Sequence, residues 1–210
     1  MSAQVEVILG QNITLVYRAL DLRAVDTRAL KDLVGAGSNP VVMDTPEMIV
    51  AVYPPQQVIV QIGGQRISVT LQQPGEAIGG VPIWEFAAAC DQLLRQSEML
   101  AYDYNYDAVI LSADGDVQVL FKGLFVRDQQ ALEAALGGSV HWVAPRVQFT
   151  RGRGLYSLVL EPGEEQRIKV HLNVHFESHD LPAVDQLESS FREEFDYLAS
   201  TLPELVPGGV

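Results

Sequence analysis

The sequence predicts an α+β protein with an internal duplication. Each half contains a hairpin, a short helix, mostly antiparallel strands and a longer C-terminal amphipathic helix packed on one face of the sheet. Three observations lead to this prediction. Segments recur about 100 positions apart, several stretches alternate apolar and polar residues, and each half closes with apolar residues at helical spacing. With 210 residues and 48% apolar content, the chain is long enough for a substantial core.

Four pairs of matching segments occur in the same order in the two halves. QRISVTLQ at 65–72 recurs as QRIKVHLN at 166–173, and DTRALKDLVG at 26–35 recurs as DQQALEAALG at 128–137. The other pairs are VILGQNITLVYRAL at 7–20 with VILSADGDVQVLFKGL at 109–124, and VPIWEFAAACDQLLRQ from 81 with LPAVDQLESSFREEFDYLAS from 181. We therefore expect one α+β repeat at 1–100 and a second at 101–210, packed as one pseudo-twofold unit.

Each half is expected to open with a hairpin and continue into a short helix. The apolar pairs VIL with LVY, and VIL with VLF, supply the hairpin strands, and the Asp-Gly dipeptide at 114–115 suits a tight turn in the second copy. The short helix would begin at Asp26 or Asp128, whose carboxylates can accept hydrogen bonds from free backbone amides. It would end at Gly35 or Gly137.

Strands and a longer helix follow in each half. The predicted strands are 41–44, 48–53, 56–62 and 66–73 in the first half, and 139–143, 146–151, 154–161 and 166–177 in the second. The closing helices begin near Pro82 and Pro182, because proline suits a first helical turn. Cys90 lies on the packed face of the first closing helix, so we expect a buried small apolar residue rather than a nucleophile.

The order of these elements resembles the duplicated fold of the TATA-binding-protein type. Because the edge strand of a sheet has unpaired backbone groups that can bond to another strand, we expect the two halves to join edge to edge into one curved sheet. That family presents a basic concave sheet to DNA, whereas this chain is acidic, so no DNA-binding residues are carried over. VIVQIGGQRISVTLQQPGEAIGGVPIWEF and IKVHLNVHFES are also similar to a sporadically distributed family of uncharacterised prokaryotic proteins, and this similarity implies no known activity.

Composition argues against several classes of function. The chain has 27 acidic and 14 basic residues, and its net charge of -13 repels polyanions and disfavours nucleic-acid binding. No apolar run approaches the ~20 residues that a helix needs to cross a bilayer. The N-terminal MSAQVEVILG lacks a secretory signal, so we expect a soluble cytoplasmic protein. A single cysteine rules out an intramolecular disulfide and a cysteine-rich zinc cluster.

Three histidines recur at intervals of four in HLNVHFESHD: His171, His175 and His179. On a helix this spacing would suit zinc ligands. From 166 onward, however, polar and apolar residues alternate without a break, which predicts a strand. At ~3.3 Å per residue His171 and His175 would be ~13 Å apart along that strand, too far to share an ion. We therefore predict a solvated polar face, with no metal and no other cofactor.

Basic residues gather in the second half. Alternation places Arg167, Lys169 and His171 together on one face, whereas the first half has Ser68 and Thr70 in the places of the last two. Such a patch could bind a small anion or an acidic protein surface, or it could simply protect an exposed sheet from aggregation. The candidate ligand- or partner-binding residues are Arg146, Arg151, Arg153, Arg167, Lys169, His171 and His175.

Other motifs do not predict catalysis. SADGD at 112–116 suits a hairpin turn and lacks the further ligands of a calcium loop, and GAGSNP at 35–40 lacks a phosphate-loop pattern. In YDYNYD at 102–107 the tyrosines would line one side of an extended chain, as a seam between the repeats or as a contact surface. We predict no catalytic residues.

Two functions remain open. The first is a non-catalytic protein-binding or scaffold module, acting on a protein partner or by self-association, without contact to a membrane. The alternative is a binder of small anionic ligands, or an enzyme, that uses the Arg/Lys/His face of the second repeat.

Overall fold

The computed structural model describes residues 4–34, 39–75, 81–94, 97–111, 116–164 and 166–205. Its centre is one nine-stranded sheet in which every neighbouring pair is antiparallel, with the order β2-β3-β4-β5-β1-β6-β9-β8-β7. The strands are β1 (Gln4–Tyr17), β2 (Val41–Asp44), β3 (Met48–Tyr53), β4 (Val58–Gly63), β5 (Arg66–Gly75), β6 (Met99–Leu111), β7 (Arg146–Arg151), β8 (Gly154–Pro162) and β9 (Arg167–Glu177).

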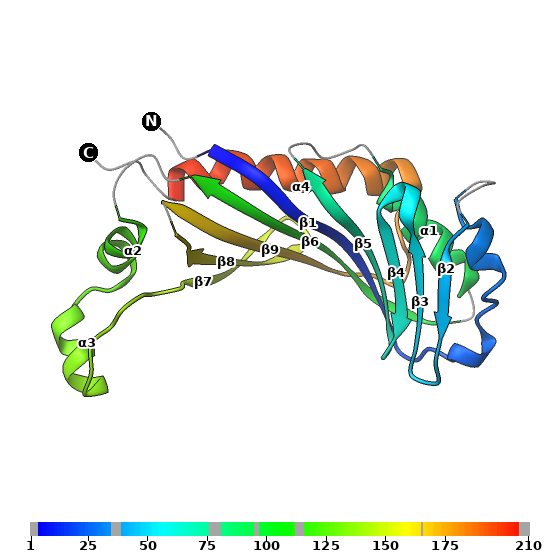
Figure 1. The fold of residues 1–210 in the computed structure, drawn as a ribbon, viewed down its shortest axis with the longest axis horizontal. Coiled ribbons are helices and arrows are strands. Elements are labelled where there is room, and N and C mark those ends of the chain that lie inside the picture. Colours follow the sequence, from blue (N-terminus) through cyan, green and yellow to red (C-terminus); the bar gives the residue numbers. More distant parts are fainter. Residues whose placement is uncertain are drawn as a thin grey trace.

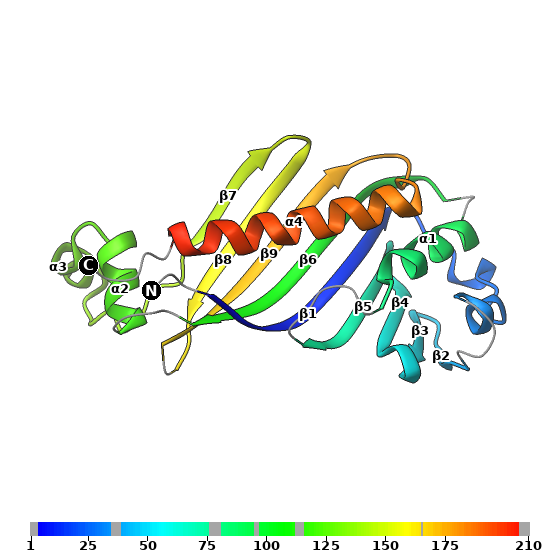
Figure 2. The same cartoon turned by 90° about the horizontal axis from the view of Figure 1, so that it is seen from above.

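Two helices cover one face of this sheet (Figures 1 and 2). They are α1 (Ile83–Leu93) and α4 (Val184–Leu205). We call the covered side the helix face and the opposite side the free face. The predicted apolar spacing of α1 is confirmed, since Ile83, Phe86, Ala87 and Cys90 are buried. The sheet curves so that the free face lies on the inside of an arch (Figure 1).

Beyond one end of the sheet the chain forms α2 (Val117–Phe125), α3 (Gln129–Leu136) and an extended stretch that leads into β7 (Figures 1 and 2). We call residues 117–145 the arm. At the other end, three short 3-10 turns (Leu22–Ala24, Ala29–Asp32 and Pro54–Gln56) complete the described elements. Within the described residues, no helix is both long and apolar enough to cross a membrane.

Most of the strand predictions are confirmed, with shifts of one or two residues at the ends of β4, β5, β8 and β9. The stretch 139–143 is not a strand, because no neighbouring strand pairs with it. The predicted short helix forms in the second half as α3: Asp128 accepts a hydrogen bond from the Ala131 amide, and Gly137 ends the helix with φ 65°. In the first half only a 3-10 turn forms after Asp26, and Gly35 lies outside the described residues.

The predicted opening hairpins are wrong. In the first half a single strand, β1, runs through the whole stretch. In the second half, β6 supplies the first predicted strand, but Val117–Phe125 is helical because Asp116 caps its first turn by accepting from the Gln118 amide at 2.8 Å. The predicted 114–115 turn lies outside the described residues.

One sheet extends through both predicted halves and joins them through the β1–β6 pair. β5 follows β1 on one side of that pair, and β9 follows β6 on the other. The internal duplication itself stays a prediction.

The tyrosines of β6 face the helices. Tyr104 and Tyr106 are fully buried beneath α4 and pack edge-on or tilted against Phe191. The Tyr106 hydroxyl donates to the Phe191 carbonyl at 2.6 Å, and the Tyr104 hydroxyl lies 2.6 Å from Ser190 Oγ. Burial raises the pKa of Tyr106 well above its usual value, so the hydroxyl remains a donor. These contacts attach α4 to β6.

Cys90 is buried on the face of α1 that meets the sheet, as predicted. Burial raises the pKa of its thiol to about 12. The thiolate that a nucleophile requires is therefore scarce at neutral pH, and the residue acts as part of the core.

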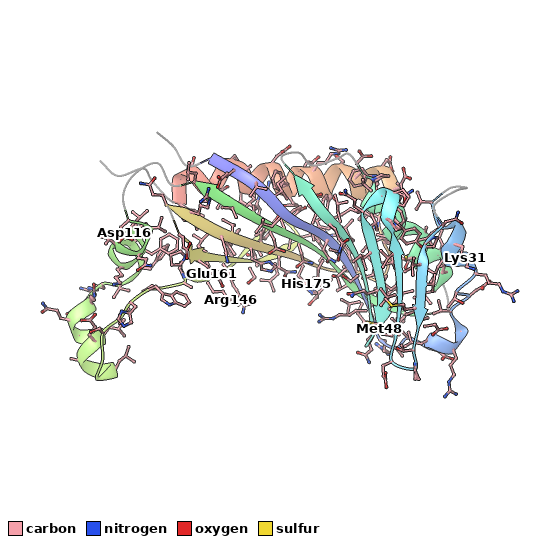
Figure 3. All side chains as sticks on the ribbon, in the orientation of Figure 1. Lys31, Met48, Asp116, Arg146, Glu161 and His175 are labelled. Carbon is pink, nitrogen blue, oxygen red and sulfur yellow. The ribbon has the colours of Figure 1, made fainter. Side chains whose placement is uncertain are left out.

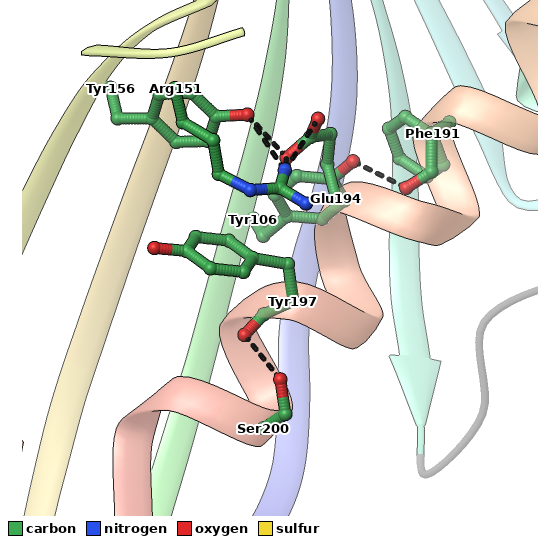
Figure 4. Close-up of polar contacts among 7 residues, drawn as sticks. All are labelled: Tyr106, Arg151, Tyr156, Phe191, Glu194, Tyr197 and Ser200. Carbon is green, nitrogen blue, oxygen red and sulfur yellow. Dashed lines mark hydrogen bonds and ion pairs between the residues drawn. The ribbon is translucent and has the colours of Figure 1, made fainter. Parts of the chain in front are cut away.

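Replacing Tyr106 with Phe removes the hydroxyl that binds the Phe191 carbonyl. We expect Tyr106→Phe to lower the free energy of unfolding by ~1 kcal/mol, which urea denaturation can measure. Tyr197→Phe is the matched control, because the Tyr197 hydroxyl donates to no described residue (Figure 4). Equal losses in the two variants would contradict the role assigned to the Tyr106 hydroxyl.

Candidate functional site

Polar side chains cross the middle of the free face from strand to strand. Residues of one cross-strand row are paired in register over β5, β1, β6, β9 and β8; they are Thr70, Asn12, Asn105, Asn173 and Ser157. The row exists because each strand alternates, with its apolar residues packed beneath the helices and its polar residues on the free face. On β9 this alternation is regular from Arg167 to His175, as the sequence predicted.

Three asparagines form the centre of this row, and we call Asn12, Asn105 and Asn173 the asparagine ladder. Asn173 Nδ2 donates to Asn105 Oδ1 at 2.9 Å, and Asn105 Nδ2 donates to Asn12 Oδ1 at 3.0 Å. Asn12 Nδ2 continues the chain to the hydroxyls of Ser68 and Thr70 on β5. The linked bonds fix the orientation of each amide and make the surface rigid.

A histidine–aspartate pair lies on each side of the ladder. His175 Nδ1 lies 2.6 Å from Asp103 Oδ1, and His171 Nδ1 lies 2.8 Å from Asp107 Oδ1. Both aspartates come from β6 and both histidines from the directly opposite positions of β9. Because each carboxylate binds Nδ1, each imidazole keeps Nε2 for other contacts.

The environment of His171 favours its charged form. The hydrogen bond to Asp107 raises the pKa of His171, burial opposes that shift, and the negative charge of Asp107 adds to it. Gly10 on β1 pairs with Asp107, and a Cβ at Gly10 would approach the Asp107 carboxylate to 3.3 Å. A residue without a side chain therefore leaves space for the carboxylate beside its histidine.

Three of the predicted basic residues lie on the free face near these pairs. Arg167 reaches across β6 and forms two bonds to Glu6, from Nε at 2.8 Å and from Nη2 at 3.0 Å. Arg146 on β7 lies on the same side of the sheet as His175 (Figure 3), and it donates to Ser157 Oγ at 3.1 Å. No acidic side chain of the described residues forms an ion pair with Lys169. These cations are spread over the face rather than gathered around one point.

Arg151 belongs to the opposite side of the sheet. Its Nη1 lies 3.0 Å from Glu194 Oε2 of α4 and 3.2 Å from the Tyr156 hydroxyl, and its guanidinium stacks 4.1 Å from the Tyr197 ring centre (Figure 4). The Tyr156 hydroxyl also donates to Glu194 at 2.7 Å. Arg151 thus connects the end of β7 to α4, and it does not join His171 in one patch.

Arg153 and His179 lie away from the row, and of these two only Arg153 is among the predicted binding residues. Arg153 follows Arg151 in the β7–β8 hairpin and lines a small hollow with Tyr102 and Phe176. His179 lies beyond β9, where its Nδ1 is 3.1 Å from the Met99 carbonyl. Within the described part of the chain, no three metal-binding side chains come together.

An open cavity of about 380 Å³ adjoins His171 on the free face. Its wall includes Lys169 and His171, but also the carboxylates of Asp107 and Glu161, and the apolar side chains Leu9 and Val159. The opposed charges leave little net positive potential for an anion.

The sequence prediction missed the β6 and β1 members of this surface. Asp103, Asn105 and Asp107 were visible in YDYNYD, in the places between the tyrosines, but their partners depend on the pairing of β6 with β9. Asn12 gave no signal of its own, because a lone polar residue in a strand is ordinary.

No protein-family model matches this chain, and no curated protein is significantly similar to it.

The raised pKa of His171 makes part of the stability depend on pH. The ordinary pKa of histidine is 6.5, and the pKa of His171 is higher in the folded protein. The charged imidazole therefore contributes its full stabilisation below pH 6.5, and this contribution disappears as pH rises through the pKa of the folded state. We expect the loss of unfolding free energy in His171→Gln to be larger at about pH 5.5 than at about pH 8.5. Urea denaturation at both values measures it.

Asp107→Asn provides the control for that measurement. Without the carboxylate, the pH dependence attributed to His171 should disappear, and an NMR titration should show the imidazole near its ordinary pKa. A His171 pKa that is the same in the parent and in Asp107→Asn would contradict the pairing.

Proposed function

We propose that this protein is a non-catalytic binding module whose free face contacts a protein partner. The proposal depends mainly on one observation: the free face has no helix over it among the described residues, yet its polar side chains are already fixed by bonds to one another. A rigid surface loses little side-chain entropy when it binds.

The charges of this face also suit a protein partner better than a free anion. Asp103, Asp107 and Glu6 each contact a basic side chain of the same face. Paired charges and amides offer donors and acceptors in fixed places, which is the chemistry of a polar protein interface. Hydrolysis by nucleophilic catalysis requires a base beside a nucleophile. Neither His171 nor His175 forms a hydrogen bond to a hydroxyl or thiol in the described chain, so these histidines do not form such a pair.

The face also has an apolar end. Val41, Met43 and Met48 of β2 and β3 are exposed there, beyond the polar centre. An apolar region beside a rigid polar one resembles the composition of many protein interfaces.

Asn173→Arg tests this proposal, because it introduces a long charged side chain at the centre of the free face. Photo-crosslinking in the native host, followed by mass spectrometry, should recover the partner at least tenfold less with Asn173→Arg than with the parent, the loss that ~1.4 kcal/mol of binding energy produces. Ser189→Arg, on the outer side of α4, should leave recovery unchanged.

Gln148→Arg is a second free-face variant, which tests the proposal if Asn173→Arg does not fold. Gln148 is exposed on β7 in the same row, where it pairs in register with Ser157, so the substitution disturbs no bond of the ladder. Unchanged crosslinking in both free-face variants, with unchanged melting temperatures, would contradict the proposal.

A second candidate function is the binding of a small anion at the 380 Å³ cavity, where the ammonium of Lys169 forms no ion pair with a described residue, against the opposing charges of Asp107 and Glu161. Inorganic phosphate should then shift the backbone NMR signals of residues 169–171, and Lys169→Ala with His171→Ala should abolish the shifts. The absence of any shift in the parent at about 10 mM phosphate would exclude affinity in the usual range for a cellular ligand.

A further inference from the structure

The arm carries an unusual concentration of exposed apolar side chains. Six of the fifteen large hydrophobic residues that are exposed in the described chain lie within these 29 positions, with exposed fractions between 36% and 67%. They are Val119, Leu124, Phe125, Leu132, Leu136 and Trp142. Single exposed apolar residues are ordinary, but a concentration of them marks a contact surface.

The helix at the far end of the arm is well defined but lacks support. Asp128 and Gly137 cap α3, Gln129 Nε2 donates to Glu133 at 2.9 Å, and the Val140 amide donates to Glu133 at 2.9 Å. None of the residues of α3 is buried, although Leu132 and Leu136 recur at helical spacing on one side. A helix of eight residues is marginal in water without packing, so this geometry requires a surface to pack on.

The charge of the arm indicates what that surface is. Residues 117–145 carry Lys122 and Arg127 against Asp128 and Glu133, so the arm is balanced within a chain of net charge -13. Two copies of this acidic chain repel each other over most of their surfaces, and the arm is a region where they can approach without that cost. A membrane surface is a poorer match, since interfacial helices are rich in Lys and Arg on their polar side.

The available area agrees with a pair of arms. The exposed fractions of the six side chains, applied to side-chain areas of about 150–250 Å², leave on the order of 600 Å² of apolar surface on each copy. If all six side chains were covered on both copies, the pair would bury roughly 1,200 Å², the lower bound for a specific interface. In a twofold dimer the same patch serves both copies, so both sides of the contact are present on this chain.

We propose that the protein forms a twofold dimer in which the arm of one copy packs against the arm of the other through these six side chains, Leu132, Leu136 and Trp142 among them. The arm lies beyond the end of the sheet (Figure 2), so it leaves the free face of its own copy uncovered. The dimer does not depend on the partner proposed for the free face.

Sedimentation velocity over a concentration series tests the dimer. The full chain should shift from 23.0 kDa to twice that mass with rising concentration. Leu132→Glu with Leu136→Glu should raise the dissociation constant at least tenfold, whereas Val184→Glu, an exposed position at the start of α4, should not. A parent that remains monomeric at about 100 μM, or a dimer that the arm substitutions leave intact, would overturn the proposal.

Trp142 supplies a second measurement that does not depend on the glutamate variants. Trp84 is buried and Trp142 is exposed, so Trp84→Phe leaves the arm as the source of tryptophan fluorescence. Dilution of this variant should shift the emission to longer wavelength as dimers separate. The emission could instead be independent of protein concentration and shift to shorter wavelength when lipid vesicles are added. That result would assign the arm to a membrane surface and contradict the dimer.

Discussion

The alternation of side chains along β6 is the constraint on which both faces of this protein depend. β6 pairs with β1 on one edge and with β9 on the other, so it is an interior strand next to the middle strand β1. When Tyr104 and Tyr106 point toward α4, Asp103 and Asp107 must point to the free face. The tyrosine hydroxyls hold the long helix, and the carboxylates hold the histidines of β9. Packing on one face therefore positions the polar groups on the other.

Much of the sheet could be predicted from the sequence, because alternation is a local property that each strand displays by itself. One failure came from a local signal that periodicity does not carry, and the other from the lack of a neighbouring strand. The apolar run from Val117 to Phe125 suits a strand or a helix equally well, and the cap at Asp116 decides for the helix. The stretch 139–143 has strand-forming residues, but no strand lies beside it. The periodicity of a segment does not show which strand, if any, will pair with it.

The candidate site shows the same division. The polar side of β9 was predicted correctly, but the bonds of His171 and His175 required the register between β6 and β9. The candidate basic residues do not all lie on one face, as their spacing indicates: Arg146 and Arg151 are five positions apart on one strand, and an odd interval places side chains on opposite faces. Arg151 accordingly contacts Glu194 of α4, while Arg146 contacts Ser157 on the free face.

The interlocked faces of β6 also determine which kinds of genetic change the protein can tolerate. A substitution at Asn105 or Tyr102 changes one side chain and leaves the direction of every other side chain of the strand unchanged. The insertion or deletion of a single codon between Met99 and Leu111 would instead reverse the direction of every side chain that follows it, placing carboxylates beneath α4 and tyrosine rings in solvent. The number of residues in this strand is therefore more tightly constrained than their identity.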